Sequence, residues 1–202
     1  MIAILDYGSG NLRSAQRAFE STGMEVVLTS ERALALEAKG LVVPGVGAFR
    51  ACMSGLTSIG GDEIIRERAL KSRPTLGICI GMQIMFSSGS EPSRDHAGST
   101  SGVGIWQGTV SKLTAPVLPH MGWNTVEAAT GSMLFAGIED ESFYFVHSYA
   151  AREASGLNVT WSEYGGKFVS AVEDGAMCAT QFHPEKSGWA GLALIRNWTK
   201  TL

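Results

Sequence analysis

Residues 74–83, PTLGICIGMQ, decide the fold of this chain. The apolar run 74–79 predicts a buried strand, and residues 80–88 predict a helix that follows it without a loop. The Gly-x-Cys-x-Gly pattern at this junction is typical of the turn that presents a nucleophile between a strand and a helix, with Cys79 in the place that serine takes in hydrolases. Alone the motif is weak, because a structural cysteine at the end of a buried strand would leave the same letters.

The chemistry of a cysteine nucleophile explains the spacing around Cys79. A tight, strained turn would push its side chain out of the sheet, and Gly77 and Gly81 would let the strand and the helix pass close together. The positive end of the helix favours the thiolate. The backbone N–H of Ile80 is placed to donate to an oxyanion.

Upstream of this elbow, apolar runs alternate with amphipathic segments. Such alternation is typical of βαβ units, in which parallel strands form one sheet with helices on both faces. The sequence therefore predicts an α/β fold with a flavodoxin-like, open and mostly parallel sheet. The predicted strands are residues 2–5, 24–29 and 40–45, and the predicted helices are residues 12–22, 31–38 and 48–72, the last broken near residues 60–61.

In the second half of the chain, from about residue 89, the strands lie closer together and turn residues are more frequent. This predicts antiparallel hairpins added to the parallel core, a surface loop over residues 87–104 and a final helix over residues 187–200. We find no linker, so we expect a single domain over residues 1–202. The predicted strands are residues 108–113, 124–128, 142–149, 156–164, 167–174 and 177–182.

The composition limits the class of protein. Of the 202 residues, 45% are hydrophobic and 17% are charged, and the net charge of −3 comes without a basic run. These values predict a soluble globular protein that does not bind nucleic acid. No apolar stretch is long enough to span a membrane, and the N-terminal residues 1–10 are typical of a first strand rather than a signal peptide.

The three cysteines fit a reducing compartment, so we expect a cytoplasmic protein. None of them are paired at C-x-x-C spacing, and we expect neither a metal nor a cofactor. Cys52, on a predicted helix, and Cys178, in an apolar strand, are predicted to lie in the core. His96, in the polar loop, is expected to be solvated.

A candidate base lies in residues 181–187, QFHPEKS. Pro184 holds the preceding residue extended, and residues two apart in an extended segment point to the same side. His183 and Glu185 can therefore converge as a base and the carboxylate that orients it. For His-Pro-Glu alone, a turn histidine beside a solvated glutamate is the better explanation.

Two glycine-rich turns follow predicted strands. Residues 44–47, PGVG, lie where open α/β sheets place ligands, and their glycines would let a backbone amide turn toward a substrate oxygen. An ordinary strand–helix turn would have the same sequence. Gly8 and Gly10 resemble half of a dinucleotide fingerprint, but Arg13 stands in the place of the third glycine, so nucleotide binding is not predicted.

Together, PGVG, GICIGMQ and QFHPE have the order and spacing of class I, triad-type glutamine amidotransferases, and the chain resembles that family. Further segments are similar to one branch, the glutaminase subunits of imidazole glycerol phosphate synthase from histidine biosynthesis. The resemblance covers nearly the whole chain and is weakest over residues 89–104. These further segments are DYGSGNL (6–12), PGVGAF (44–49), PHMGWN (119–124) and FVHSY (145–149).

The resemblance implies a reaction. Cys79 attacks the side-chain amide of glutamine, His183 carries the proton to the leaving ammonia, and water hydrolyses the glutamyl thioester. Glu185 orients His183. The oxyanion hole of the family corresponds to the amides of Val46, Gly47 and Ile80. The residues that hold glutamine correspond to Gly47, Gln83, Glu91, Ser148 and Tyr149.

The resemblance also implies a partner, a (β/α)8-barrel cyclase that forms a heterodimer with the glutaminase and consumes its ammonia. The cyclase makes imidazole glycerol phosphate and an aminoimidazole carboxamide ribotide. Without the resemblance, Met121 and Trp123 would be expected in the core, and His120 and His147 are predicted to be structural. The docking residues would be Asn11, Arg13, Pro119, Met121 and Trp123.

Three alternatives stay open. One is the glutaminase subunit of another synthase, such as that of pyridoxal phosphate synthesis. A second is a cysteine hydrolase or stress protein on a related scaffold, and a third is an idle scaffold subunit. If the chain is the active glutaminase, the family further suggests that PGVG rests with its amide turned away until the partner binds its substrate.

Overall fold

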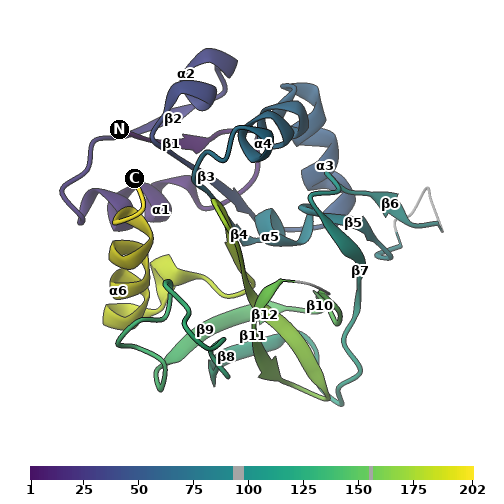
Figure 1. The fold of residues 1–202 in the computed structure, drawn as a ribbon. Helices are drawn as coiled ribbons and strands as arrows, with labels where there is room; N and C mark the ends of the chain where they lie inside the picture. Colours follow the sequence, from purple (N-terminus) through teal and green to yellow (C-terminus); the bar gives the residue numbers. More distant parts are fainter. Residues whose placement is uncertain (93–97, 155–156) are drawn as a thin grey trace.

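A computed structural model describes residues 1–92, 98–154 and 157–202 of the chain. Over these residues the largest sheet has seven strands in the order β11-β12-β13-β4-β3-β1-β2 (Figure 1). Strands β2, β1, β3, β4 and β13 pair in parallel, whereas β12 and β11 continue the sheet as antiparallel strands. The strands are β1 (Ile2–Leu5), β2 (Val26–Thr29), β3 (Gly40–Gly45), β4 (Thr75–Cys79), β11 (Asn158–Glu163), β12 (Lys167–Asp174) and β13 (Met177–Thr180).

The central strands are hidden on both faces. Every residue of β1, β3, β4 and β13 is buried, as expected of parallel strands that read as continuous apolar runs. The predicted α/β fold with a large, mostly parallel sheet is confirmed.

Helices cover the two faces of this sheet (Figure 1). α1 packs on α6 and on the first two strands, and α4 contacts both α2 and α3. None of the helices in the described ranges is long and apolar enough to cross a membrane. The bounds are α1 (Leu12–Glu20), α2 (Arg32–Glu37), α3 (Phe49–Ser58), α4 (Gly61–Leu70) and α6 (Gly188–Thr199).

The helix predicted over residues 80–88 is wrong in length. α5 covers only Ile80–Gln83, and β5 (Phe86–Gly89) follows it. The carbonyl of Ile84 accepts from the N–H of Val103, and the carbonyl of Met85 accepts from the amides of the two residues at 105 and 106. Strand-like pairing with a distant segment therefore takes the carbonyls that a longer helix would have needed.

The loop predicted over residues 87–104 is also partly wrong, because β5 and the short β6 (Thr100–Ser101) lie within it. β5 runs parallel to β7 (Trp106–Lys112), which pairs on its other side with the antiparallel β10 (Tyr149–Ala151). The predicted solvation of His96 lies outside the described residues.

A separate hairpin forms from β8 (His120–Thr125) and β9 (Ser142–His147). The strand predicted over residues 124–128 thus begins four residues earlier, so the PHMGWN segment is mostly strand. Alternation along β8 buries His120 and exposes Met121 and Trp123. The hairpin confirms the antiparallel character predicted for the second half, whereas the parallel β5–β7 pair departs from it.

The topology brings three turns to one edge of the large sheet. Parallel strands end together, and β1 and β3 flank the point where the strand order reverses, which is where such sheets bind ligands. The turn after β1, the PGVG turn at the end of β3 and Cys79 at the end of β4 therefore share this edge. Gly45 pairs directly with Cys79 across the two strands.

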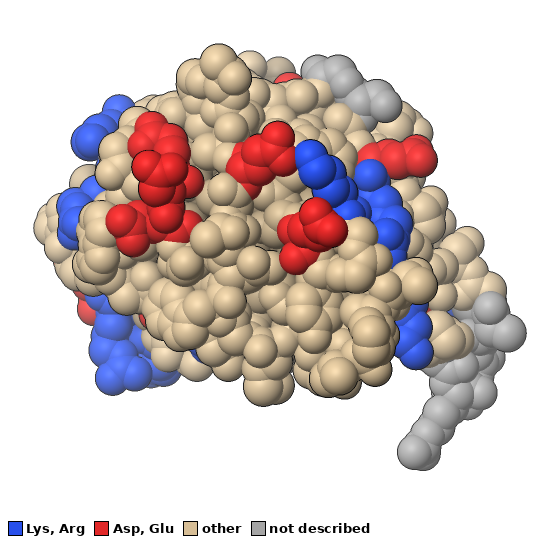
Figure 2. Space-filling view, turned by 90° about the horizontal axis from the view of Figure 1, so that it is seen from below, with Lys and Arg blue, Asp and Glu red and all other residues tan. Residues whose placement is uncertain are grey.

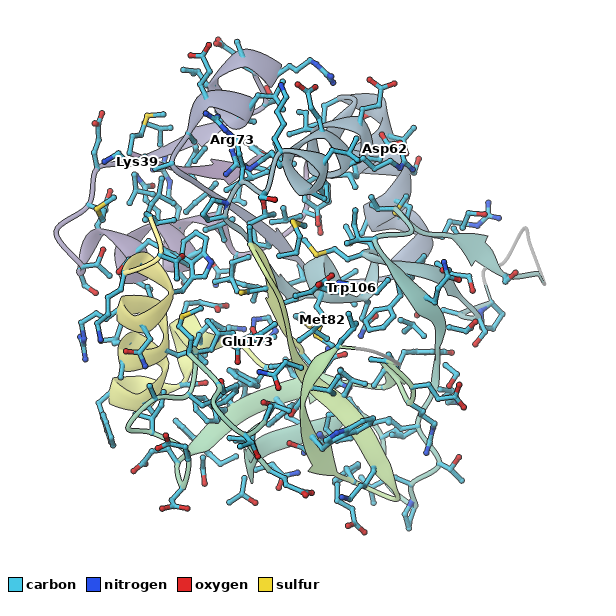
Figure 3. All side chains as sticks on the ribbon, in the orientation of Figure 1. Lys39, Asp62, Arg73, Met82, Trp106 and Glu173 are labelled. Carbon is cyan, nitrogen blue, oxygen red and sulfur yellow. The ribbon has the colours of Figure 1, made fainter. Side chains whose placement is uncertain are left out.

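Arg68 is a fully buried cation at the edge of the sheet opposite the three turns. Its guanidinium donates to the carbonyls of Ala35, Ala38 and Pro74 at 2.9, 3.0 and 2.6 Å. Burial, with a smaller effect of nearby Arg73, lowers the pKa of Arg68 to about 10, so the group stays charged at neutral pH. Figure 3 shows Arg73 and Lys39 on this side of the molecule, near the start of β3.

We expect Arg68→Met to lower the free energy of unfolding by roughly 3 kcal/mol, because several buried carbonyls lose their donor. Arg32→Met is the matched control, since Arg32 forms ion pairs with Glu63 and Glu67 while its side chain is 46% exposed, and it should cost less than about 1 kcal/mol. Urea unfolding of both variants measures the difference. Equal losses would show that the carbonyl contacts of Arg68 contribute little.

Candidate active site

Cys79 stands in a strained backbone conformation at the junction of β4 and α5. Its φ of 55° and ψ of −110° are rarely adopted by residues other than glycine, and such a conformation costs about 1–3 kcal/mol. The strain predicted for a nucleophile turn is therefore present at the predicted residue. The side chain leaves the sheet at its carboxyl edge, with only 3% of the residue exposed.

Glycines let β3, β4 and α5 approach one another behind Cys79. A Cβ on Gly81 would lie 1.8 Å from the carbonyl oxygen of Val43, and one on Gly77 would lie 2.7 Å from the carbonyl oxygen of Gly81. No side chain fits at either place without moving the backbone. The close passage of strand and helix that the Gly-x-Cys-x-Gly pattern predicted is confirmed by these distances.

His183 and Glu185 meet, but not in the way that the sequence suggested. Nδ1 of His183 lies 2.8 Å from Oε1 of Glu185, and both side chains are almost fully buried. His183 itself is extended, with φ −99° and ψ 98°, whereas residues Pro184–Lys186 form a single 3-10 turn. The extended segment predicted through Glu185 is therefore wrong, and the tight turn brings the carboxylate back to the imidazole.

The environment of His183 favours its charged form. Burial lowers the pKa of His183, but interactions with Cys79 and Glu185 outweigh this effect and raise it to about 9. A protonated imidazole beside the sulfur stabilises a thiolate. Burial raises the pKa of both Cys52 and Cys178, the latter to about 12, so these two thiols stay protonated at neutral pH.

The predicted residues converge on one cavity of about 400 Å³. It contains Cys79, His183 and every residue predicted to hold substrate, and Glu185 lies behind His183. The lining residues are Val46, Gly47, Cys79, Ile80, Gln83, Glu91, Val146, His147, Ser148, Tyr149, His183 and Lys186.

Two of the predicted substrate contacts already have protein partners. Oε2 of Glu91 accepts from the N–H of Phe49 at 2.8 Å, which fixes the carboxylate at the N-terminus of α3. Nε2 of Gln83 donates to the carbonyl of Tyr149 at 2.8 Å and to Oε1 of Gln181 at 3.0 Å. A carboxylate, an amide and the hydroxyl-bearing segment 148–149 are groups that suit the charged ends of an amino acid.

The PGVG turn is held by residues that follow β1. The hydroxyl of Tyr7 donates to the carbonyl of Pro44 at 2.6 Å. The N–H of Val46 donates to Oγ of Ser9 at 3.1 Å, and the same hydroxyl donates to the carbonyl of Val46 at 2.9 Å. One of the predicted oxyanion donors is thus engaged with Ser9, whereas Ile80, as the first residue of α5, has no intrahelical acceptor for its N–H.

His120 and His147 form a directed hydrogen-bond chain. Nδ1 of His147 faces the carbonyl of Tyr149 at 3.0 Å and must carry the hydrogen, so Nε2 accepts from Nδ1 of His120, also at 3.0 Å. Burial lowers the pKa of His120 to about 4 and that of His147 to about 3, so both rings are neutral. This arrangement agrees with the structural role predicted for both. In the described parts of the chain, no three His, Cys, Asp or Glu side chains gather as a metal site.

Sequence reasoning missed three residues that touch this site. Gln181 approaches the sulfur of Cys79, Lys186 lines the cavity, and Ser9 holds the PGVG turn. Gln181 could have been found, because it lies two residues before His183 and an extended segment places both on one side. Ser9 offers no local signal, since its partner Val46 is 37 residues away.

The predicted docking residues lie at the surface. Met121 is 62% exposed and Trp123 60% exposed, so the core position weighed for both from composition is wrong. Pro119 is exposed as well, and Asn11 and Arg13 are exposed at the start of α1, where Oδ1 of Asn11 caps the helix by accepting from residue 14. Seen from below in Figure 2, acidic and basic side chains leave a broad area without charge in the lower part of the view.

Comparison with known proteins shows relatives of about the same length. The chain is 57% identical over 205 residues to the Imidazole glycerol phosphate synthase subunit HisH of Mycolicibacterium paratuberculosis, covering 100% of this chain and 98% of that protein. It is also 57% identical over 211 residues to the protein of that name from Corynebacterium diphtheriae, covering 100% and 99%. The HisH subunit of Thermobifida fusca is 54% identical over 211 residues, covering 100% and 98%.

Solved structures share the fold. A crystal structure described as a glutamine amidotransferase aligns with a TM-score of 0.77 at 18% identity, covering 99% of this chain and 97% of that one. PurLQS from Thermotoga maritima aligns with a TM-score of 0.69 at 16% identity, covering 99% and 95%. The family Glutamine amidotransferase class-I matches residues 3–200. Because that match spans nearly the whole chain, the chain belongs to the class-I glutamine amidotransferases.

Proposed function

We propose that the chain is the glutaminase subunit of an imidazole glycerol phosphate synthase and hydrolyses glutamine to glutamate and ammonia for a cyclase partner in histidine biosynthesis. The observation that carries the proposal is the 57% identity over the full chain to subunits of that name. The same likeness favours this function over the subunit of pyridoxal phosphate synthesis weighed from the sequence.

In the first half of the reaction, the sulfur of Cys79 attacks the side-chain amide carbon of glutamine. A tetrahedral intermediate forms, and its oxygen takes the negative charge. His183, which the raised pKa keeps protonated, gives its proton to the amide nitrogen, and ammonia leaves as the C–N bond breaks. Glu185 keeps Nδ1 of His183 occupied, so that the other ring nitrogen faces the reaction.

In the second half, a water molecule attacks the glutamyl thioester. The neutral His183 takes a proton from that water, the C–S bond breaks, and glutamate leaves while Cys79 returns to the thiolate beside a protonated imidazole. The cavity supplies complementary groups for the two ends of glutamine. Glu91 pairs with the α-ammonium, and the segment of Ser148 and Tyr149 holds the α-carboxylate.

The oxyanion hole is incomplete while the PGVG turn keeps its present hydrogen bonds. Ile80 offers one N–H from the start of α5. The N–H of Val46 is committed to Ser9 at 3.1 Å, and the Val46 carbonyl accepts from the same hydroxyl at 2.9 Å. The peptide between Val46 and Gly47 carries that carbonyl, so its rotation would release Ser9 and turn the N–H of Gly47 toward the oxyanion. Val46 is 43% exposed and Gly47 has a φ of 94°, so this peptide has room to rotate. This supports a subunit that is slow until its partner binds.

The partner that best fits the exposed side chains is the (β/α)8-barrel cyclase, in a heterodimer. Ammonia released into water would be protonated and lost, so the consuming enzyme gains by docking over the glutaminase. Exposed Met121 and Trp123 supply an adaptable apolar contact and an aromatic anchor. With Asn11, Arg13 and Pro119 they form the proposed docking surface.

We expect Cys79→Ala to lower the rate of glutamine-dependent synthesis of imidazole glycerol phosphate in the assembled pair by roughly 10³-fold or more, because no thioester can form. Synthesis from added ammonium salt should continue at the native rate, since the cyclase is untouched. Cys178→Ala is the control for loss of a buried thiol. Retained use of glutamine by Cys79→Ala would contradict the mechanism.

We expect Glu185→Gln to lower kcat/KM by roughly 10²-fold and to move its alkaline limb to lower pH. The Glu185 carboxylate raises the pKa of His183, so its neutralisation lowers that pKa, and the proton needed by the leaving ammonia is lost sooner as the pH rises. Rates of glutamate release between pH 6 and pH 10 measure the shift. Glu127→Gln, at an exposed ion pair with Lys167, should leave the profile unchanged.

We expect the lone chain to release glutamate slowly and Ser9→Ala to raise that basal rate by about tenfold, because the backbone of Val46 loses the hydroxyl that holds both its N–H and its carbonyl. Each of these two hydrogen bonds stabilises the resting turn by about 1 kcal/mol. Ser30→Ala, at an exposed serine beyond β2, is the control. Fast turnover by the unmodified lone chain would refute the resting state proposed for this turn.

A further inference from the structure

Gln181 is a fully buried side chain beside the candidate nucleophile. It follows β13 directly, and its backbone N–H donates to the carbonyl of Ser170 at 2.8 Å, which fixes its place in the sheet. Nε2 of Gln181 lies 3.7 Å from Sγ of Cys79. The reaction derived above does not use this contact.

The backbone carbonyl of Tyr149 decides which end of the Gln181 side-chain amide, oxygen or NH₂, faces the sulfur of Cys79. The carbonyl of Tyr149 can only accept, so Gln83 must turn its NH₂ group toward it, at 2.8 Å. The second hydrogen of that NH₂ group points to Gln181 at 3.0 Å, so the atom of Gln181 that accepts it must be Oε1. The NH₂ of Gln181 is then left facing the sulfur of Cys79.

The Tyr149 carbonyl, at which this series of hydrogen bonds begins, accepts a second hydrogen bond. The carbonyl of Tyr149 also accepts from Nδ1 of His147 at 3.0 Å. The two hydrogen bonds use both lone pairs of this oxygen and hold the carbonyl in place between Gln83 and His147. A flipped Gln181 would place two oxygens or two NH₂ groups against each other, in a place where neither glutamine is more than 1% exposed.

The geometry points to Gln181 as a catalytic residue of the glutaminase: its Nε2–H donates to the thiolate of Cys79, in a direction imposed through Gln83 by the Tyr149 carbonyl. The inference rests on the proposed function and adds a second donor to the sulfur beside His183. A neutral amide is suited to this place, because it stabilises the thiolate without repelling the protonated imidazole. The contact favours the thiolate, which is the form that attacks, over the protonated thiol.

The test is alkylation of the folded chain by iodoacetamide, followed at Cys79 by mass spectrometry of the peptide that contains it. Gln181→Met keeps the length and volume of the side chain and removes the donor. At pH 7 we expect it to slow alkylation of Cys79 by about tenfold, because a thiolate that loses a hydrogen bond is less populated. The curve of alkylation rate against pH should move to higher pH and meet the native curve at alkaline pH, where Cys79 is ionised in both proteins.

Gln181→Glu is the second variant and preserves the shape of the side chain almost completely. It replaces the donor by a carboxyl group, so alkylation at pH 7 should be slower than in the native chain. This variant decides the question if Gln181→Met does not fold, as judged by its urea unfolding midpoint. Ser162→Ala is the matched control, since the Ser162 hydroxyl is buried and donates to the carbonyl of Thr125, away from the sulfur.

Native rates of alkylation in a folded Gln181 variant, at every pH, would overturn the inference. Glutamate release in the assembled pair adds a second readout, in which kcat should fall while KM for glutamine stays nearly constant. The two proposals fail separately. If the chain did not use glutamine, the alkylation shift would persist without any glutamate release, whereas a structural role for Gln181 would lower stability and leave the alkylation curve in place.

Discussion

The close contact among β3, β4 and α5 is the constraint on which the site depends. A Cβ at Gly81 would lie 1.8 Å from the carbonyl oxygen of Val43, so the helix can start where it does only with glycine at this place. That position in turn forces Cys79 into a φ of 55° and directs its sulfur away from the sheet. The strain is tolerated because the surrounding strands are completely buried and cannot relax independently.

The carbonyl of Tyr149 organises the polar interior around that sulfur. Gln83 reaches it from α5, the helix that follows Cys79, and His147 reaches it from β9. Because a carbonyl only accepts, it gives both neighbours a definite direction, and each passes that direction to its next partner. His120 therefore donates to His147 at 3.0 Å, and Gln181 presents its oxygen to Gln83. Such a chain has low energy only when every member agrees.

The proposed docking surface and the base are joined through β9. Trp123 pairs with Tyr144 across the hairpin, and their rings meet edge to face at 6.1 Å. The backbone of Tyr144 accepts from the N–H of His183 at 3.0 Å and donates to Ser187 at 2.9 Å, and Ser187 donates to the carbonyl of His183 at 2.7 Å. A partner docked over Trp123 would thus contact the hairpin whose strand β9 holds His183 in place.

The sequence alone determined the parallel core and the nucleophile turn, because apolar periodicity and obligatory glycines are local properties. It also predicted that His183 and Glu185 meet, but through an extended segment, whereas a 3-10 turn over Pro184–Lys186 brings them together. Tertiary structure decided the rest. α5 ends after Gln83 because a distant segment takes the carbonyls at 84 and 85, and Trp123 is exposed because β8 begins at His120. Gln181 meets Cys79 across 102 residues of chain. Local sequence propensity does not reveal hydrogen-bond partners that lie so far apart along the chain. Only the folded structure shows which donor each carbonyl or side chain pairs with.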